Sequence, residues 1–297
     1  MMGNKRMIGI IYLFYLLVAL WVFIPIYWMV NTSLHSEELM LSKSLPLFPI
    51  KPTYENFRFI FATAEVMQER LERGLATYFL PTIAASLPNA IRNSMIVAIS
   101  VMLINSALAP FAAWIFQRIK FKGSFTIYLS TVLTRLIPGV AIIIPLFAIM
   151  KGLNLLDTYI ALIIVHTMIT FPLSIWISYN FFEGIPVEIE EAAFVDGYSR
   201  FEIYRKIIFP IMKTAIIAVS AFSFMISYSE FLFAFLLTTS DASRTVPVII
   251  AAMAANPVMP RTIMAAAGII AMIPPIIVFI ILRRYIIRGL VSGVVVR

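Results

Sequence analysis

Residues 8–31 read IGIIYLFYLLVALWVFIPIYWMVN, a stretch without one charged side chain. A helix needs roughly 20 largely apolar residues to cross a bilayer, so this stretch is long enough to span one. It exceeds the roughly 7–15 residues of the apolar region of a signal peptide, and no small-residue cleavage site follows it. The sequence therefore predicts a retained first transmembrane helix.

Five further windows share this apolar character and are each long enough to cross the membrane. They cover residues 94–116, 125–150, 158–182, 211–239 and 262–285. A shorter window at 75–90 holds two prolines, so it is interpreted as an interfacial or re-entrant segment. Together the windows predict an all-α integral membrane protein with six transmembrane helices.

The composition of the whole chain agrees with a membrane class. Of its 297 residues, 61% are hydrophobic and only 13% are charged. A soluble domain is typically about 45–50% apolar and about 25% charged. The chain has no cysteine, which excludes disulfides, thiol catalysis and Cys-ligated metals.

The basic residues indicate how the predicted helices are oriented. With the N-terminus inside, the short outer loops hold only Lys151, Arg244 and Arg261, and the other short-loop Lys and Arg residues lie inside. Cytoplasmic loops carry such an excess, so both termini are predicted to face the cytoplasm. The net charge of +8 is then a signal of topology. Nucleic-acid binding is not indicated, because the basic residues are not interleaved with aromatic side chains on one face.

The one long, charge-rich inner stretch joins spans four and five and reads EGIPVEIEEAAFVDGYSRFEIYRKIIFP over residues 183–210. Pro186 suits the first turn of a helix, and the acidic residues after it suit the positive end of the helix dipole. Gly197 suits a left-handed C-terminal cap, and Ser199 with Glu202 forms a capping-box pattern. The pattern predicts two short helices separated by a sharp turn, outside the bilayer.

Two interpretations of this loop fit its capping pattern. A solvated connection between spans is one, and a helix that docks on a partner is the other. The apolar run at residues 192–195 favours docking, since it lies on a short exposed helix. The length of the loop also favours docking, because a plain connection needs only a few residues.

The loop resembles the EAA loop of ABC importer membrane subunits. The resemblance is carried by Glu191-Ala192-Ala193, Asp196-Gly197, Ile207 and Pro210, with Phe209 in place of the usual leucine. Further matches to the carbohydrate-uptake, maltose-permease branch extend over almost the whole chain. They are Asn93-Ser94, Ile137-Pro138, Ile144-Pro145-Leu146, Leu153-Asn154-Leu155, Asp157-Thr158, Ser229-Glu230-Phe231, Arg284-Tyr285, Gly289-Leu290 and Gly293.

The resemblance implies a coupling helix that seats in a groove of a cytoplasmic ATPase subunit. The residues assigned to this contact are Glu188, Glu190, Glu191, Ala192, Ala193, Phe194, Asp196, Gly197 and Pro210. Among these, Glu190, Glu191 and Asp196 are expected to offer surface carboxylates to basic groups of the ATPase. The chain has no G-x-x-x-x-G-K-[ST] phosphate loop, so this chain is expected to bind no cofactor and ATP-Mg is expected to be hydrolysed by the partner.

The same resemblance implies a set of partners and a location. The expected partners are a homologous second permease subunit, two ATPase subunits, an external solute-binding protein, a carbohydrate substrate and membrane lipid. The expected location is the bacterial inner membrane, as a multi-pass protein. The predicted function is the permease subunit of a binding-protein-dependent sugar importer, driven by ATP through alternating access.

The chain is expected to divide at about residue 92. Residues 1–92 would hold the first transmembrane helix and a long external loop, in which 62–92 departs from the family as an insertion. Residues 93–297 would hold the transmembrane core, the coupling loop and a cytoplasmic tail. The tail from 289 to 297 resembles a segment that reaches between ATPase subunits, and a frayed basic terminus is the alternative.

Three ionisable residues fall inside predicted spans, where charges are costly and usually pair or line a pathway. Arg135 and Glu230 either neutralise each other, pair with the second permease, or line the sugar pathway. The candidate pathway residues are Arg135, Trp176, Asn180, Tyr228 and Glu230. An unpaired Arg135 would suit an acidic oligosaccharide, and His166 is expected to be packed and hydrogen-bonded.

Two other transporter classes remain open. An ion-coupled secondary transporter would use Arg135 and Glu230 as a relay, and an ABC permease for a non-sugar solute would share the loop. An enzyme is not indicated, because the chain lacks H-E-x-x-H and G-x-S-x-G and its two histidines have no second metal ligand at suitable spacing.

Overall fold

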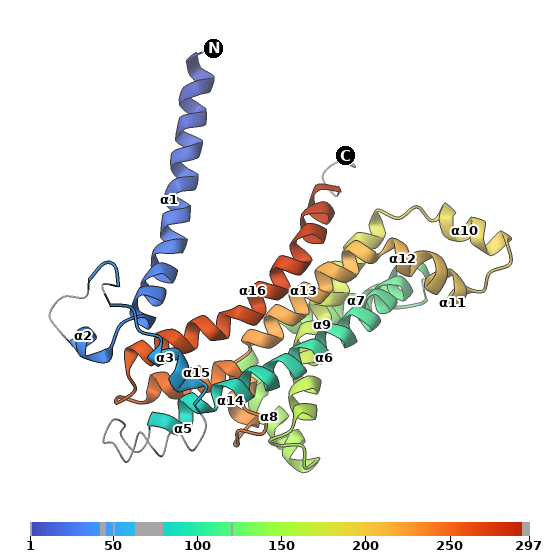
Figure 1. Ribbon diagram of the computed structural model, residues 1–297. Helices are drawn as coiled ribbons and strands as arrows, with labels where there is room; N and C mark the ends of the chain where they lie inside the picture. Colours follow the sequence, from blue (N-terminus) through green and yellow to red (C-terminus); the bar gives the residue numbers. More distant parts are fainter. Residues whose placement is uncertain (1, 42–45, 50, 63–79, 120, 293–297) are drawn as a thin grey trace. The chain divides into compact units, whose positions relative to one another are not determined.

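The computed structural model describes residues 2–41, 46–49, 51–62, 80–119 and 121–292, and every regular element within these ranges is a helix. The chain forms two compact units, one of residues 1–88 and 249–272 and one of residues 89–248 and 273–297 (Figure 1). Most of the predicted insertion at 62–92 and the end of the tail after 292 lie outside the described residues.

The first unit is built on two long helices. Helix α1 spans Met2–Ser33, and α16 spans Arg261–Ser292, of which residues 261–272 belong to this unit. The short helices α2 (Glu37–Leu41), α3 (Glu55–Ile60) and α5 (Leu80–Ala85) complete it. The Glu37 carboxylate accepts hydrogen bonds from the backbone N–H groups of Arg261 and Thr262, so it caps the positive end of α16.

The second unit contains the predicted core. Its elements run in chain order as α6 (Leu87–Trp114), η1 (Ile115–Ile119), α7 (Ser124–Leu133), η2 (Thr134–Leu136), α8 (Gly139–Gly152), α9 (Tyr159–Glu183), α10 (Glu188–Val195), α11 (Arg200–Ile203), η3 (Tyr204–Ile208), α12 (Phe209–Ile211), α13 (Lys213–Ser229) and α14 (Leu232–Leu237). Helix α15 (Val246–Ala255) begins in this unit and continues into the first, and α16 returns to this unit from residue 273. Figure 1 shows α10 and α11 at one end of α6, α9 and α13, and α8 and α14 at the other end.

Within the described residues, the helices are long and apolar enough to make four to six membrane spans. Four single helices qualify, over residues 7–33, 83–119, 159–183 and 261–283. Two bent pairs qualify only if each counts as one span, namely 124–136 with 139–152 and 200–211 with 213–229. All six predicted windows therefore fall on these elements.

Two windows that the sequence predicts as continuous helices are interrupted. The third bends by 101° between residues 136 and 139, where Ile137 is extended with ψ 120° before Pro138. Proline pushes the preceding residue out of the helical region, which explains the break. The helix of the fifth window ends at Ser229, because Glu230 is extended with ψ 125°. A new helix, α14, begins at Leu232.

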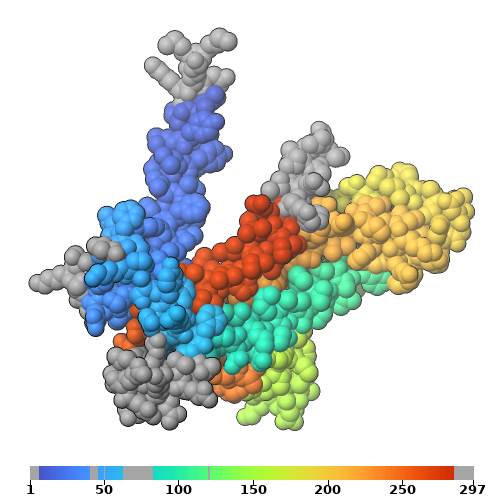
Figure 2. Space-filling view, in the orientation of Figure 1, coloured from blue at the N-terminus to red at the C-terminus, as the bar shows by residue number. Residues whose placement is uncertain are grey.

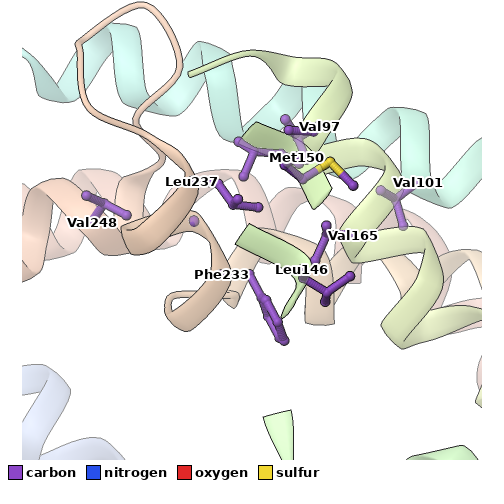
Figure 3. Packing of buried hydrophobic residues seen from close by; sticks show 11 residues of the cluster. Val97, Val101, Leu146, Met150, Val165, Phe233, Leu237 and Val248 are labelled. Carbon is purple, nitrogen blue, oxygen red and sulfur yellow. The ribbon is translucent and has the colours of Figure 1, made fainter. Parts of the chain in front are cut away.

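An apolar core holds the α8 and α14 end of the unit together. Figure 3 shows Val97 and Val101 of α6 converging with Leu146 of α8, Val165 of α9 and Phe233 of α14. All five side chains are buried, with at most 7% of their surface exposed. At the centre of the same helices the contact becomes polar, because the Asn105 amide donates to Thr170 Oγ1 at 2.7 Å and to Ser223 Oγ at 2.9 Å.

A carboxylate joins two loops of this unit. Asp157 has a left-handed φ of 60° and accepts hydrogen bonds from the backbone N–H groups of Thr239 and Ser240 and from the hydroxyls of Ser240 and Ser243. Its own N–H donates to Leu237 O at 2.8 Å. Burial alone raises the pKa of the Asp157 carboxyl, but these donors outweigh it and hold the pKa well below the ordinary value of 3.8.

We expect Asp157→Asn to lower the thermal stability of the detergent-solubilised protein by a few degrees, because two hydroxyls and two N–H groups lose a charged acceptor. Since the pKa is lowered in the folded state, the difference from wild type should be complete above pH 3.8 and shrink as the pH falls through the folded-state pKa. Melting curves from pH 7 downwards measure it. Asp196→Asn, which removes an exposed carboxylate, is the control. An equal loss of thermal stability in both variants would contradict the conclusion that Asp157 joins the two loops.

Candidate functional site

The loop at residues 183–210 forms the two predicted helices. Gly197 has φ 89°, and its N–H donates to Phe194 O while the N–H of Tyr198 donates to Ala193 O. This pair of bonds is a Schellman motif, so the predicted left-handed cap of α10 is confirmed. The predicted first-turn place of Pro186 is wrong by two residues, because α10 begins at Glu188.

The second helix begins as its sequence predicts. The Ser199 hydroxyl accepts from the Glu202 N–H, and the Glu202 carboxylate accepts from the Ser199 N–H at 3.1 Å, which is a capping box. Lys206 Nζ lies 2.9 Å from the same carboxylate. The turn between α10 and α11 is therefore fixed by backbone caps on both sides.

An ion pair ties α10 to the end of α6. Arg118 Nε lies 2.7 Å from Glu190 Oε1, and Trp114 Nε1 donates to Glu190 Oε2 at 3.0 Å. The Arg118 and Glu190 side chains are only 14% and 13% exposed. Arg118 also donates to Ile185 O, at 2.5 Å. The expectation that Glu190 offers a surface carboxylate is therefore wrong, because this carboxylate is held within the chain.

Apolar packing supports the same contact. Ala193, on the inner side of α10, is 4% exposed and belongs to a buried cluster with Trp114, Phe182 and Tyr204. The small side chain lets α10 approach the ends of α6 and α9 closely. The sequence analysis missed the contacts of Arg118 and Trp114 with Glu190. The signal that the sequence offers for them is that both residues lie near the inner end of the second apolar window.

The outer side of α10 is uncovered. Phe194 and Val195 are 63% and 85% exposed. Six other residues assigned to the ATPase contact are also exposed, namely Glu188, Glu191, Ala192, Asp196, Gly197 and Pro210. Beside them lies a groove of about 430 Å³ between α10, α11 and the end of α6. Figure 2 shows this end of the unit, in yellow and orange, without covering chain.

A cavity of about 690 Å³ lies where the third span breaks. Its lining residues come from 131–142, from 167–172 in the middle of α9, and from Phe233 of α14. Arg135 is the charged residue of this lining, and its Nη1 donates to Ile169 O at 2.7 Å.

Glu230 does not pair with Arg135. Its carboxylate accepts from the N–H groups of Phe233 and Ala234, so it caps α14, and it lies 3.2 Å from His166 Nε2. His166 is fully buried, and its Nδ1 lies 2.9 Å from Ser227 Oγ. Of the alternatives for Arg135 and Glu230, the structure rules out mutual neutralisation, and it confirms that His166 is packed and hydrogen-bonded.

The other candidate pathway residues lie outside this cavity lining. Trp176 and Asn180 are exposed one helical turn apart on α9, beyond Pro172 towards the α10 end. Tyr228 is 5% exposed and stacks on Phe224, with ring centroids 5.7 Å apart. The structure therefore brings Arg135 to a cavity but does not bring the five residues together. No group of three metal-ligating side chains occurs in the part of the chain that the structure describes.

The helices define a multi-pass integral membrane protein. A family model described as "Binding-protein-dependent transport system inner membrane component" matches residues 106–292. The chain belongs to this family of inner-membrane transport subunits.

Individual relatives resemble the chain over almost its full length. The trehalose/maltose transport system permease protein MalG of Thermococcus litoralis is 30% identical over 279 residues, 94% of this chain and 93% of that one. The trehalose transport system permease protein SugB of Mycobacterium tuberculosis is 28% identical over 281 residues, 94% of both chains.

A solved structure shares the fold. It is a chain of a bacterial ABC transporter involved in the import of the acidic polysaccharide alginate, with a TM-score of 0.74 and 19% identity. The similarity covers 95% of this chain and 97% of that one.

We expect Glu190→Gln to destabilise the detergent-solubilised protein by about 2–3 kcal/mol, because Arg118 keeps its charge at a largely buried site without a counter-ion. Thermal or denaturant unfolding measures this. Glu191→Gln, one residue further on the exposed side, is the matched control and should leave stability within about 0.5 kcal/mol. Equal stability of the two variants would show that the ion pair does not hold α10.

Proposed function

We propose that this chain is the permease subunit of a binding-protein-dependent ABC importer that moves a sugar or oligosaccharide across the inner membrane. Its membership of the transport family carries the proposal, together with an exposed face on α10 that is rigidly attached to α6. The names of the relatives, which include trehalose and maltose permeases, support a carbohydrate substrate.

In this proposal six spans cross the membrane with both termini in the cytoplasm. The first bent pair then counts as one span, and the second pair contributes one span through α13, in agreement with the distribution of Lys and Arg. Helices α10 and α11 lie on the cytoplasmic side as coupling helices, and the Asp157 loop lies on the outer side.

The proposed assembly contains a second permease, two ATPase subunits and an external solute-binding protein. The exposed Phe194 and Val195 would enter an apolar groove of the ATPase, and Glu188, Glu191 and Asp196 would meet basic groups at its rim. ATP-Mg is hydrolysed by the ATPase subunits. Closure of the ATPase pair moves α10, and the attached ends of α6 and α9 follow it, which opens the spans to the outside.

We expect the reconstituted chain to take up sugar only with the ATPase partner and ATP. In proteoliposomes, an imposed ion gradient without ATP should drive no uptake, while ATP inside with loaded binding protein outside should. Uptake driven by the gradient alone would instead favour an ion-coupled transporter, in which the buried His166–Glu230 pair would be the candidate relay.

A substitution at Gly197 tests the docking. An added Cβ at this residue meets no described atom within 4 Å, so the turn is open at the point where a side chain would start. We expect Gly197→Arg to abolish substrate-stimulated ATPase activity and to leave membrane insertion intact. Gly197→Ala shares the strain of the positive φ without the bulk or charge, and it should retain most of the activity. An undiminished rate in Gly197→Arg would contradict docking at this turn.

A further inference from the structure

We propose that the cavity beside Arg135 takes an anionic group of the transported sugar, such as a uronic-acid carboxylate, on the Arg135 guanidinium. This inference rests on the proposed sugar-importer function and names its substrate class.

The guanidinium of Arg135 has no counter-ion among the described residues. An arginine carries five N–H donors, and the bond from Nη1 to Ile169 O fixes its orientation. No carboxylate of the described ranges lies within 4.0 Å of it, and Glu230 is engaged by His166 and by the N-terminus of α14. A charged side chain at membrane depth is costly unless it meets an anion or water, so the remaining donors favour an anionic ligand.

The cavity has the size and lining of a site for a small sugar. Its volume of about 690 Å³ lies within the roughly 300–1,000 Å³ of small-molecule sites. Thr167 also lines the cavity, and its hydroxyl is buried without a hydrogen-bond partner among the described residues. Phe171 and Phe233 add aromatic surface for the apolar face of a sugar ring.

The place of the cavity also suits a transported ligand. It lies where the helix of the third span is broken before Pro138. Pro172 of α9 and Phe233, in the first turn of α14, also line it. Non-helical backbone at membrane depth is tolerated where it is covered by protein or lines a cavity. A carboxylate supplied by the second permease is the competing occupant, and the experiment below separates the two.

The test uses the full complex in proteoliposomes, with ATP inside and binding protein outside. The probes are radiolabelled uronic-acid oligosaccharides, with digalacturonate first, and their neutral counterparts, with digalactose first. Calorimetry with the binding protein sets equal loading for each probe. The variants are Arg135→Gln and Arg135→Lys, and Lys151→Gln is the control because it removes one exposed charge from the same pair of helices outside the cavity.

We expect ATP-driven uptake of the acidic probe, lowered about tenfold or more in Arg135→Gln, partly kept in Arg135→Lys and unchanged in Lys151→Gln. The Arg135 variants should still assemble, as size-exclusion chromatography measures. Uptake of neutral sugars only would overturn the inference and leave the proposed function intact. Acidic uptake unaffected by Arg135→Gln, or failed assembly of that variant, would also overturn it. Absence of ATP-driven uptake for every sugar would overturn the proposed function and the inference with it.

Discussion

The constraint on which this structure depends is that every backbone N–H and C=O inside a bilayer must find a partner within the protein. The helices satisfy it along most of their length, but the breaks at Ile137 and Glu230 do not. At the second break the Glu230 carboxylate accepts the first N–H groups of α14. The Glu230 carboxylate therefore satisfies the interrupted backbone at its own break, whereas Arg135 donates to Ile169 O inside the continuous helix α9.

At the contact between α9 and α13, buried polar side chains also find their hydrogen-bond partners within the protein. The buried hydroxyls of Thr170, Ser174 and Ser223 and the Asn105 amide form a polar seam there. Interhelical hydrogen bonds in membranes average only about 0.6 kcal/mol each, so such a seam fixes register more than it adds stability.

The sequence was sufficient for the features that depend on local chemistry. Window length located every helix that can span, and the left-handed turn at Gly197 and the capping box at Ser199 follow from residue type and spacing. Features that depend on distant partners were not predictable in this way. The pairing of Arg118 with Glu190, 72 residues apart, cannot be derived from either neighbourhood.

The dependence on distant partners also explains why the sequence could not exclude a pair between Arg135 and Glu230. Opposite charges in neighbouring spans suggest a pair, but the choice of partner depends on where each helix breaks. Because the chain is extended at Glu230, its carboxylate reaches the first N–H groups of α14, which follows it in the chain. The carboxylate also lies 3.2 Å from His166 Nε2 of α9. Hydropathy does not reveal such a break, since residues 211–239 are apolar on both sides of it.

In the proposed function, the division of α10 into two sides would let a short helix outside the membrane move helices within it. A loop held only by its two ends would bend when a partner pushed on it, and the displacement would be lost. Here Glu190 and Ala193 on the inner side are fixed to Trp114 and Arg118, while Phe194 on the outer side remains exposed. In the proposed function, a displacement applied at Phe194 would therefore move the end of α6 or break a largely buried ion pair.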